Sequence, residues 1–238
     1  MASLTSSVHA GMHILEHNQS EIEPAWLRRA AGIVILEHYK GAFFFSGHVG
    51  TGFVSKRLGP NQWSFPSSVA LFGGGVGMQI GLQKSDIILI LESPSEMETY
   101  ERSGQLAIGS NVGATLIYGV DMQVGASAGR GGTALLFSEG RSKGAFVGVS
   151  IDGSVLVTNY FANRSFYGKG HRIRKILNNR IVPDGKSLHV CLDLNDFLVA
   201  MGNDDLTNHS ARILPITDEE DEDIDLDEKR RKEAGCSH

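Results

Sequence analysis

Between Ile33 and Tyr160 the chain is a series of short apolar runs, interrupted about every ten residues by glycine, serine, asparagine or proline, as in antiparallel strands joined by tight turns. Glycine accounts for 29 of the 238 residues and lies within the apolar runs rather than in a polar linker. Because glycine has no Cβ, these positions favour tight turns, bulges and close backbone approaches. The sequence therefore predicts a strand-rich domain.

Helices are predicted on either side of the strands and once between them. Pro24 suits the first turn of a helix over 24–31, and an amphipathic helix is expected near 187–200. Ser93-Pro94-Ser95-Glu96 matches a capping box that would start a short helix before Gly104. The predicted fold class is α+β, mainly β: a compact antiparallel β-sheet sandwich or barrel with short flanking helices at both ends.

Charge divides the chain into three expected parts. Residues 1–21 are polar and weakly patterned, so we expect a flexible N-terminal segment, followed by a domain over 22–205. Nine acids lie between Asp218 and Glu228, and four bases follow them. Such a segment repels itself and has little apolar content, so 206–238 is predicted to be an acidic, then basic, disordered tail.

Composition also limits the class of protein. The longest apolar runs hold five residues, at 87–91 and 197–201, far below the roughly 20 that a transmembrane helix needs. Two cysteines, Cys191 and Cys236, cannot form a disulfide framework. We expect a cytoplasmic protein, placed at membranes or the cortical cytoskeleton through its partners.

The motifs that suggest catalysis are incomplete. His13-Ile14-Leu15-Glu16-His17 matches the H-x-x-E-H pattern of a zinc site but has no evident third ligand. Gly73–Gly81 departs from G-x-G-x-x-G because Ile80 stands where the last glycine is needed, and a strand rather than a long helix follows. The glycines of this stretch are expected to be structural. We expect no enzymatic activity, no metal and no cofactor.

A basic segment is the strongest candidate site. Residues 164–186 hold seven bases against one acid, Asp184, which suits phosphate groups or another anionic surface, although a solvated face is an equally simple interpretation. Nucleic acid is disfavoured because the pI is about 6.0 and few aromatic residues lie among the bases. The candidate lipid-binding residues are Arg164, Lys169, Arg172, Arg174, Lys175 and Arg180.

Many short blocks, in order, give the chain a family resemblance over roughly residues 22–200. They include Phe43-Phe44-Phe45-Ser46-Gly47, Trp63-Ser64-Phe65-Pro66-Ser67, Gly73–Gly81, Asp86-Ile87-Ile88-Leu89-Ile90-Leu91, Arg141-Ser142-Lys143-Gly144-Ala145-Phe146 and Asn163-Arg164-Ser165-Phe166-Tyr167-Gly168. In these residues the chain resembles the SYLF domain family, whose animal members bind phosphoinositides and whose yeast members bind actin.

The resemblance implies a non-enzymatic module that binds a phosphoinositide or another anionic phospholipid at a membrane surface, with an actin-binding cytoskeletal module as the alternative. It also implies a compact β-rich domain. Residues 1–22 contain no Lys or Arg, so the basic N-terminal helix of the animal members has no counterpart here. The chain further departs from the family at Phe45-Ser46-Gly47-His48-Val49, where a family arginine is His48, and at Gln83.

Overall fold

The computed structural model describes residues 3–19, 22–115, 134–137 and 146–203. The N-terminal part comprises α1 (Leu4–His17), α2 (Pro24–Arg29), β1 (Gly32–Gly59), β2 (Gln62–Trp63), β3 (Ser67–Leu91) and α3 (Pro94–Ser103). The remainder comprises β4 (Gln105–Thr115), β5 (Ala134–Phe137), β6 (Phe146–Thr158), α4 (Tyr160–Tyr167), α5 (Ile173–Ile176) and α6 (Gly185–Asn203). Part of the predicted strand-rich region, 116–133 and 138–145, and the predicted tail 206–238 lie outside the described residues.

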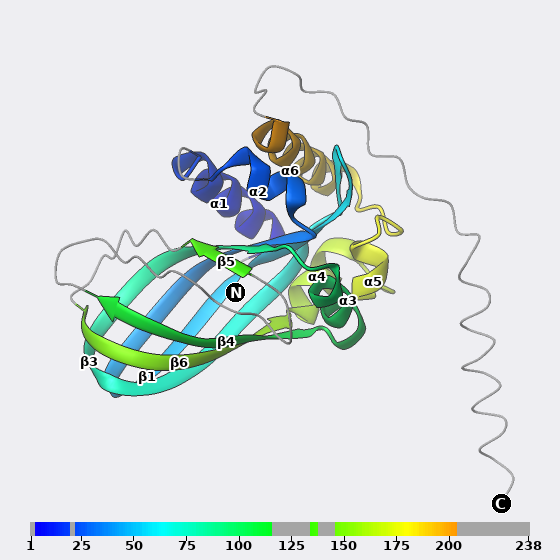
Figure 1. Cartoon of the computed structure of the whole chain (residues 1–238). Coiled ribbons are helices and arrows are strands. Elements are labelled where there is room, and N and C mark those ends of the chain that lie inside the picture. The colour runs from blue at the N-terminus through cyan, green and yellow to red at the C-terminus, as the bar shows by residue number, and fades with distance from the viewer. Residues whose placement is uncertain (1–2, 20–21, 116–133, 138–145, 204–238) are drawn as a thin grey trace, which may run out of the picture.

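One curled antiparallel sheet organises the chain (Figure 1). Its strands follow the order β2-β1-β3-β6-β4, and β5 pairs with the C-terminal end of β3. The helices gather around one end of the sheet, while the other end extends away from them. The predicted α+β class, an antiparallel sheet with flanking helices, is confirmed. Within the described residues, no helix is both long and apolar enough to cross a membrane.

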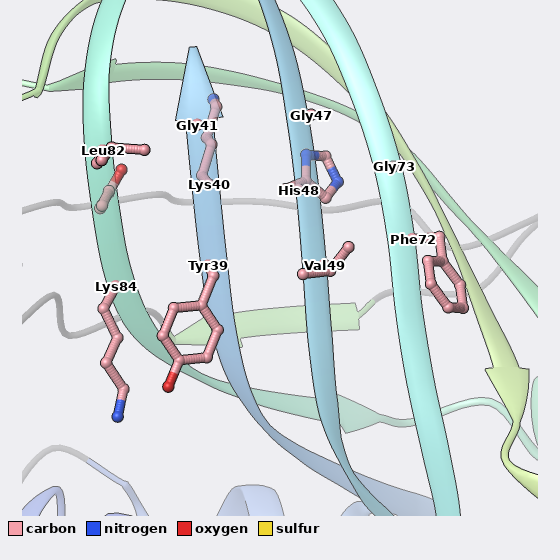
Figure 2. A pocket seen from close by; sticks show the side chains of 11 residues that line it. Tyr39, Lys40, Gly41, Gly47, His48, Val49, Phe72, Gly73, Leu82 and Lys84 are labelled. Atoms are coloured by element: carbon pink, nitrogen blue, oxygen red, sulfur yellow. The ribbon is translucent and has the colours of Figure 1, made fainter. Parts of the chain in front are cut away.

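The two long strands each change direction near their middle. The β1–β3 register shifts between Phe43 and Phe45, and Phe44 has a positive φ of 61°. Figure 2 shows the two halves of β1 side by side, flanked on each side by a half of β3. The His38 and His48 rings, one from each half of β1, lie 5.2 Å apart. β1 is therefore nested within β3, and the fold-back of β1 lies at the end of the sheet far from the helices.

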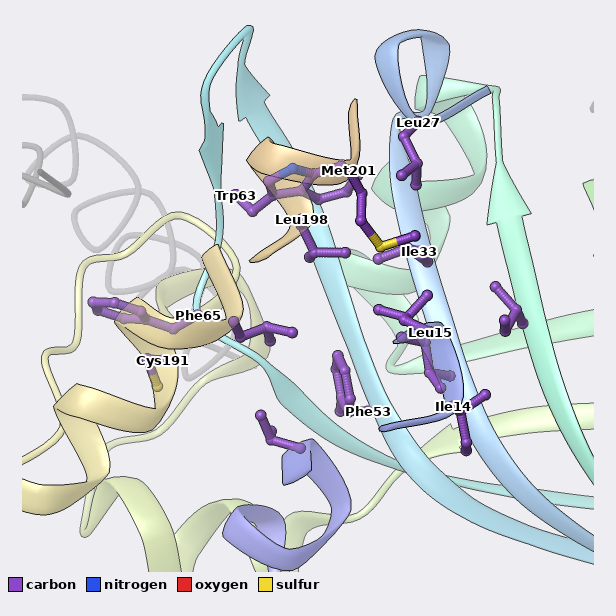
Figure 3. Close-up of a cluster of buried hydrophobic side chains, with 14 of the residues drawn as sticks. Ile14, Leu15, Leu27, Ile33, Phe53, Trp63, Phe65, Cys191, Leu198 and Met201 are labelled. Atoms are coloured by element: carbon purple, nitrogen blue, oxygen red, sulfur yellow. The ribbon is translucent and has the colours of Figure 1, made fainter. Parts of the chain in front are cut away.

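The sheet end beside the helices, which we call the base, is buried on both faces. On one face Ile33, Ile35 and Phe53 pack against side chains of α1, α2 and α6 (Figure 3). On the other face a second cluster joins Val34, Leu36 and the β3 residues Leu89 and Leu91 to α3 and α5. Continuous apolar runs such as Ile33-Val34-Ile35-Leu36 are expected where a strand is covered on both sides.

The N-terminal segment differs from the prediction. Residues 1–21 were expected to be flexible, but residues 4–17 form α1, with Leu4, Val8 and Leu15 in the core. The Ser3 hydroxyl accepts a hydrogen bond from the Ser6 amide and caps the helix. The apolar residues recur at helical spacing, so the polar residues between them mark the solvent side of a docked helix.

Helix α3 begins where the capping box predicts, but the box itself does not form. The Ser93 side chain makes no capping hydrogen bond with the helix and instead contacts the Ser95 hydroxyl at 2.7 Å. The Glu96 carboxylate is buried, and neither of its oxygens has a hydrogen-bond partner among the described residues. Burial disfavours its charged form and raises the pKa of Glu96.

Gly52 is expected to tolerate no side chain. A Cβ at this position would overlap the backbone oxygen of Ile35, which belongs to the other half of β1. Backbone cannot yield as a flexible side chain can, so Gly52→Ala should lower the free energy of unfolding by about 1–3 kcal/mol. Chemical denaturation measures this loss. Gly47→Ala is the matched control, because a Cβ at Gly47 in the same strand meets nothing within 4 Å.

Glu96 is expected to make stability depend on pH. Its pKa in the folded chain lies above the unfolded value, so its contribution is most favourable in acid and is lost as the pH rises through the folded pKa. Glu96→Gln should therefore raise the free energy of unfolding at pH 7 by about 1–3 kcal/mol, and change it little at pH 4.

Denaturation at the two pH values tests this prediction. Glu98→Gln on the exposed side of the same helix is the control. A lower stability of Glu96→Gln at pH 7 would contradict the prediction.

Candidate functional site

The predicted basic residues lie on one continuous segment that runs from α4 to just beyond α5. Arg164 is in α4, Lys169 precedes α5, and Arg172 is the N-cap residue of α5. Arg174 and Lys175 are in α5, and the Arg180 amide donates to the Lys175 carbonyl at 2.8 Å. The structure thus keeps the segment compact, with the bases distributed along it.

Buried asparagines hold this segment in place. The Asn163 Oδ1 atom accepts from the Ser68 amide at 2.7 Å, and the Asn179 Oδ1 atom accepts from the Phe65 amide at 2.6 Å. Both side chains are fully buried. Asn179 also has a positive φ of 55°, a conformation that asparagine tolerates better than most residues. The two asparagines lie on either side of five of the six bases, all except Arg180, and attach the segment to residues 65–68.

The basic side chains are available to a ligand. Arg164, Lys169, Arg172, Arg174 and Lys175 are exposed. None of these five forms an ion pair with another described residue, whereas Lys56 and Lys84 pair with Glu101 and Glu37. Arg180 differs from these five bases because it is half-buried and already interacts with another part of the protein. At the start of α4, Tyr160 and Phe161 add exposed aromatic surface to the same segment.

A second candidate site lies at the far end of the sheet. There an apolar groove of about 690 Å³ crosses both halves of β1 and of β3 (Figure 2). Gly41 and Gly47 carry no side chain above the sheet, and the larger residues around them form the walls. The apolar lining includes Tyr39, Val49, Phe72 and Leu82, and the groove is also lined by Lys40, His48, Gln83 and Lys84. Sequence reasoning placed these residues in the strand-rich region but did not identify this surface.

Buried polar side chains alternate with the exposed apolar ones along these strands. His38 shares a hydrogen bond with the Ser85 hydroxyl at 2.9 Å, and His48 shares one with the Ser154 hydroxyl at 2.8 Å. Lys40 and Gln83 are buried among them. The usual arrangement is therefore reversed here, with these polar side chains buried and large apolar side chains exposed.

The described residues provide little for metal binding or nucleophilic catalysis. His13 and His17 stack with ring centroids 4.2 Å apart, and no group of three or more His, Cys, Asp or Glu side chains could hold a metal within this part of the chain. Cys191 is buried beside Tyr167, and burial raises the pKa of its thiol to about 12. A thiol in this state is a poor nucleophile at neutral pH.

Comparison with known proteins identifies the family. A family model described as "Las17-binding protein actin regulator", named Ysc84, matches residues 72–193, about half of the chain and including all six predicted site residues. The chain therefore belongs to the Ysc84 family, which confirms the SYLF resemblance. No solved structure matches the chain.

Three relatives illustrate the similarity. An SH3 domain-containing protein of Schizosaccharomyces pombe is 35% identical over 207 residues, covering 87% of this chain and 48% of the relative. LAS seventeen-binding protein 3 of Saccharomyces cerevisiae is 37% identical over 163 residues, covering 68% of this chain and 36% of the relative. The human SH3 domain-containing YSC84-like protein 1 is 32% identical over 152 residues, covering 63% of this chain and 44% of the relative. The chain thus spans half or less of each relative.

Asn163 is expected to be needed for the position of the basic segment. Asn163→Ala removes the acceptor for the buried Ser68 amide and the donor to the Ser67 hydroxyl, so it should lower the free energy of unfolding by about 1–3 kcal/mol. Denaturant titration checks this value. Ser165→Ala, an exposed change in the same helix, should leave the stability unchanged.

Proposed function

We propose that this chain is a non-enzymatic interaction module of the actin cytoskeleton that engages an acidic surface of actin filaments or of an actin regulator through its basic segment. Family membership supports the cytoskeletal role, since the family model describes an actin regulator. The observation that carries the choice of site is that five exposed bases have no ion-pair partner among the described residues.

Physical reasoning supports a binding role for these bases. An exposed base already paired within the protein gains little from a new acidic partner, whereas an unpaired base adds directly to the attraction. The anchoring asparagines reduce the conformational freedom that the segment would lose on binding. A binding partner at the cell cortex would place the chain there.

A second candidate ligand for the same segment is an anionic phospholipid surface containing phosphoinositides. The observation in its favour is the exposure of Tyr160 and Phe161 beside the bases, because aromatic side chains favour the interface between headgroups and water. Each base near an anionic membrane contributes about 1 kcal/mol. The two ligands compete for the same residues, so the same variants test both.

Reversing two charges in α5 should weaken binding at least tenfold. We expect Arg174→Glu/Lys175→Glu to reduce co-sedimentation with actin filaments at low salt, because attraction at this surface becomes repulsion. Raised salt should weaken the binding of the unaltered chain through screening.

A double reversal outside the segment, Arg29→Glu/Arg102→Glu, is the matched control and should bind as the unaltered chain does. Parallel sedimentation with phosphoinositide vesicles separates the two ligands. If the α5 reversal abolishes vesicle binding, and neither the unaltered chain nor the variant binds actin, the membrane is the favoured ligand. Unchanged binding of both ligands after the α5 reversal would contradict the site assignment.

A further inference from the structure

The far end of the sheet carries an unusually large exposed apolar surface. We call residues 39–49 of β1 and 72–84 of β3 the arm. Phe43, Phe44 and Phe45, at the fold-back of β1, are 66%, 61% and 73% exposed. Val76, Ile80 and Leu82 of β3 are exposed around them. A soluble surface rarely groups so many large apolar side chains unless something covers them.

The exposed apolar side chains of the two strands lie next to one another. By the β1–β3 register, Phe43 pairs with Ile80 and Phe45 with Val76, so the aromatic fold-back lies among aliphatic side chains of the flanking strand. The face that bears them continues the one covered at the base by α1, α2 and α6. The described helices do not extend over the arm, so no described residue of α1, α2 or α6 covers its apolar face.

The arm is free of charged residues at its tip and carries a tyrosine and lysines behind it. Residues 41–55 and 58–83 contain no Asp, Glu, Lys or Arg, and the nearest bases behind the tip are Lys40 and Lys84. Lys84 lies 5.3 Å from the Tyr39 ring and 2.9 Å from Glu37. An apolar tip followed by a tyrosine and a lysine is the order expected at a membrane, where hydrocarbon gives way to headgroups.

The length of the arm fits one leaflet. A strand rises about 3.3 Å per residue, so roughly 13 Å separates Tyr39 from Phe43 along the strand. Half of a bilayer's hydrocarbon core is about 15 Å thick. Tyr39 and Lys84 can therefore reach the headgroups while the phenylalanines lie among acyl chains.

Much of the arm's backbone is hydrogen-bonded between strands, which a hydrocarbon environment favours. Unpaired amide and carbonyl groups are strongly disfavoured there, and the arm's strands pair with one another in a continuous register on both sides of the Phe43–Phe45 shift. The polar side chains of His38, Lys40 and His48 are buried. The outer face thus presents apolar atoms over paired strands.

We propose that the arm inserts its phenylalanine tip into the hydrocarbon of a single membrane leaflet, with Tyr39 and Lys84 at the headgroups. This site is separate from the basic segment and requires neither an anionic headgroup nor actin. It therefore stands or falls independently of the proposed function. The occupant is the acyl-chain region of the bilayer.

The test uses the full chain and vesicles of pure phosphatidylcholine at high salt, where attraction between charges is screened. The unaltered chain should co-sediment with these vesicles, and Phe43→Ser/Phe45→Ser should bind at least tenfold more weakly. Val182→Ser is the matched control, since Val182 is 50% exposed but lies before α6, away from the arm. Circular dichroism and the emission of the buried Trp63 verify that each variant remains folded.

A depth measurement gives a second readout. Phe45→Trp should be quenched more strongly by brominated acyl chains than by a headgroup quencher, after subtraction of the signal from Trp26 and Trp63. Absence of binding to neutral vesicles, binding that survives the double substitution, or quenching only at the headgroups would each overturn the proposal. A dimer in light scattering that the double substitution dissociates, without vesicle binding, would overturn it in favour of a second copy of the chain.

Discussion

The arrangement of the whole molecule depends on hydrogen bonds from buried asparagines to one short backbone segment. Asn163, Asn179 and Asn195 come from α4, from just after α5 and from α6, and their Oδ1 atoms accept from the amides of Ser68, Phe65 and Trp63. A buried amide without a partner is strongly unfavourable, so each bond specifies one docking position as well as adding stability. The helices that follow the sheet are thereby fixed to the turn that joins β1 to β3.

The sheet changes character along its length because its covering changes. At the base, helices cover both faces, and four successive residues of β1 from Ile33 to Leu36 are buried. In the arm, none of the described helices covers the outer face, and the curl of the sheet encloses the other. Glycines permit this geometry, since a Cβ at Gly73 would overlap the His48 ring and the Gly153 backbone. At Gly52 and Gly73 the missing side chain reflects close packing between neighbouring strands.

Much of the fold could be predicted from local signals, and the misses have identifiable causes. The strand-rich region and the helices beginning at Pro24 and Pro94 follow from periodicity and proline position. Helix α1 was missed because its polar residues were taken as evidence of disorder, although its apolar residues recur at helical spacing. The basic segment was visible as a charge excess, but its anchoring by Asn163 and Asn179 depends on contacts across about a hundred positions. The arm was missed because alternation shows that a strand has two faces, not which one is left uncovered.

The nesting of β1 within β3 has a consequence for how the sheet can form. Gly59 pairs with Gln62 three positions away, Val54 pairs with Ser67 thirteen positions away, and Gly32 pairs with Leu91 at the far end of the ladder. Each pair closes a short loop onto a pair already formed, so the entropy of loop closure is distributed over many small steps. A sheet whose final contacts are distant in sequence can thus grow outward from one turn, in the manner of a zipper. That turn is the segment to which the asparagines later attach, so the first part of the sheet to form is also the surface that receives the C-terminal helices.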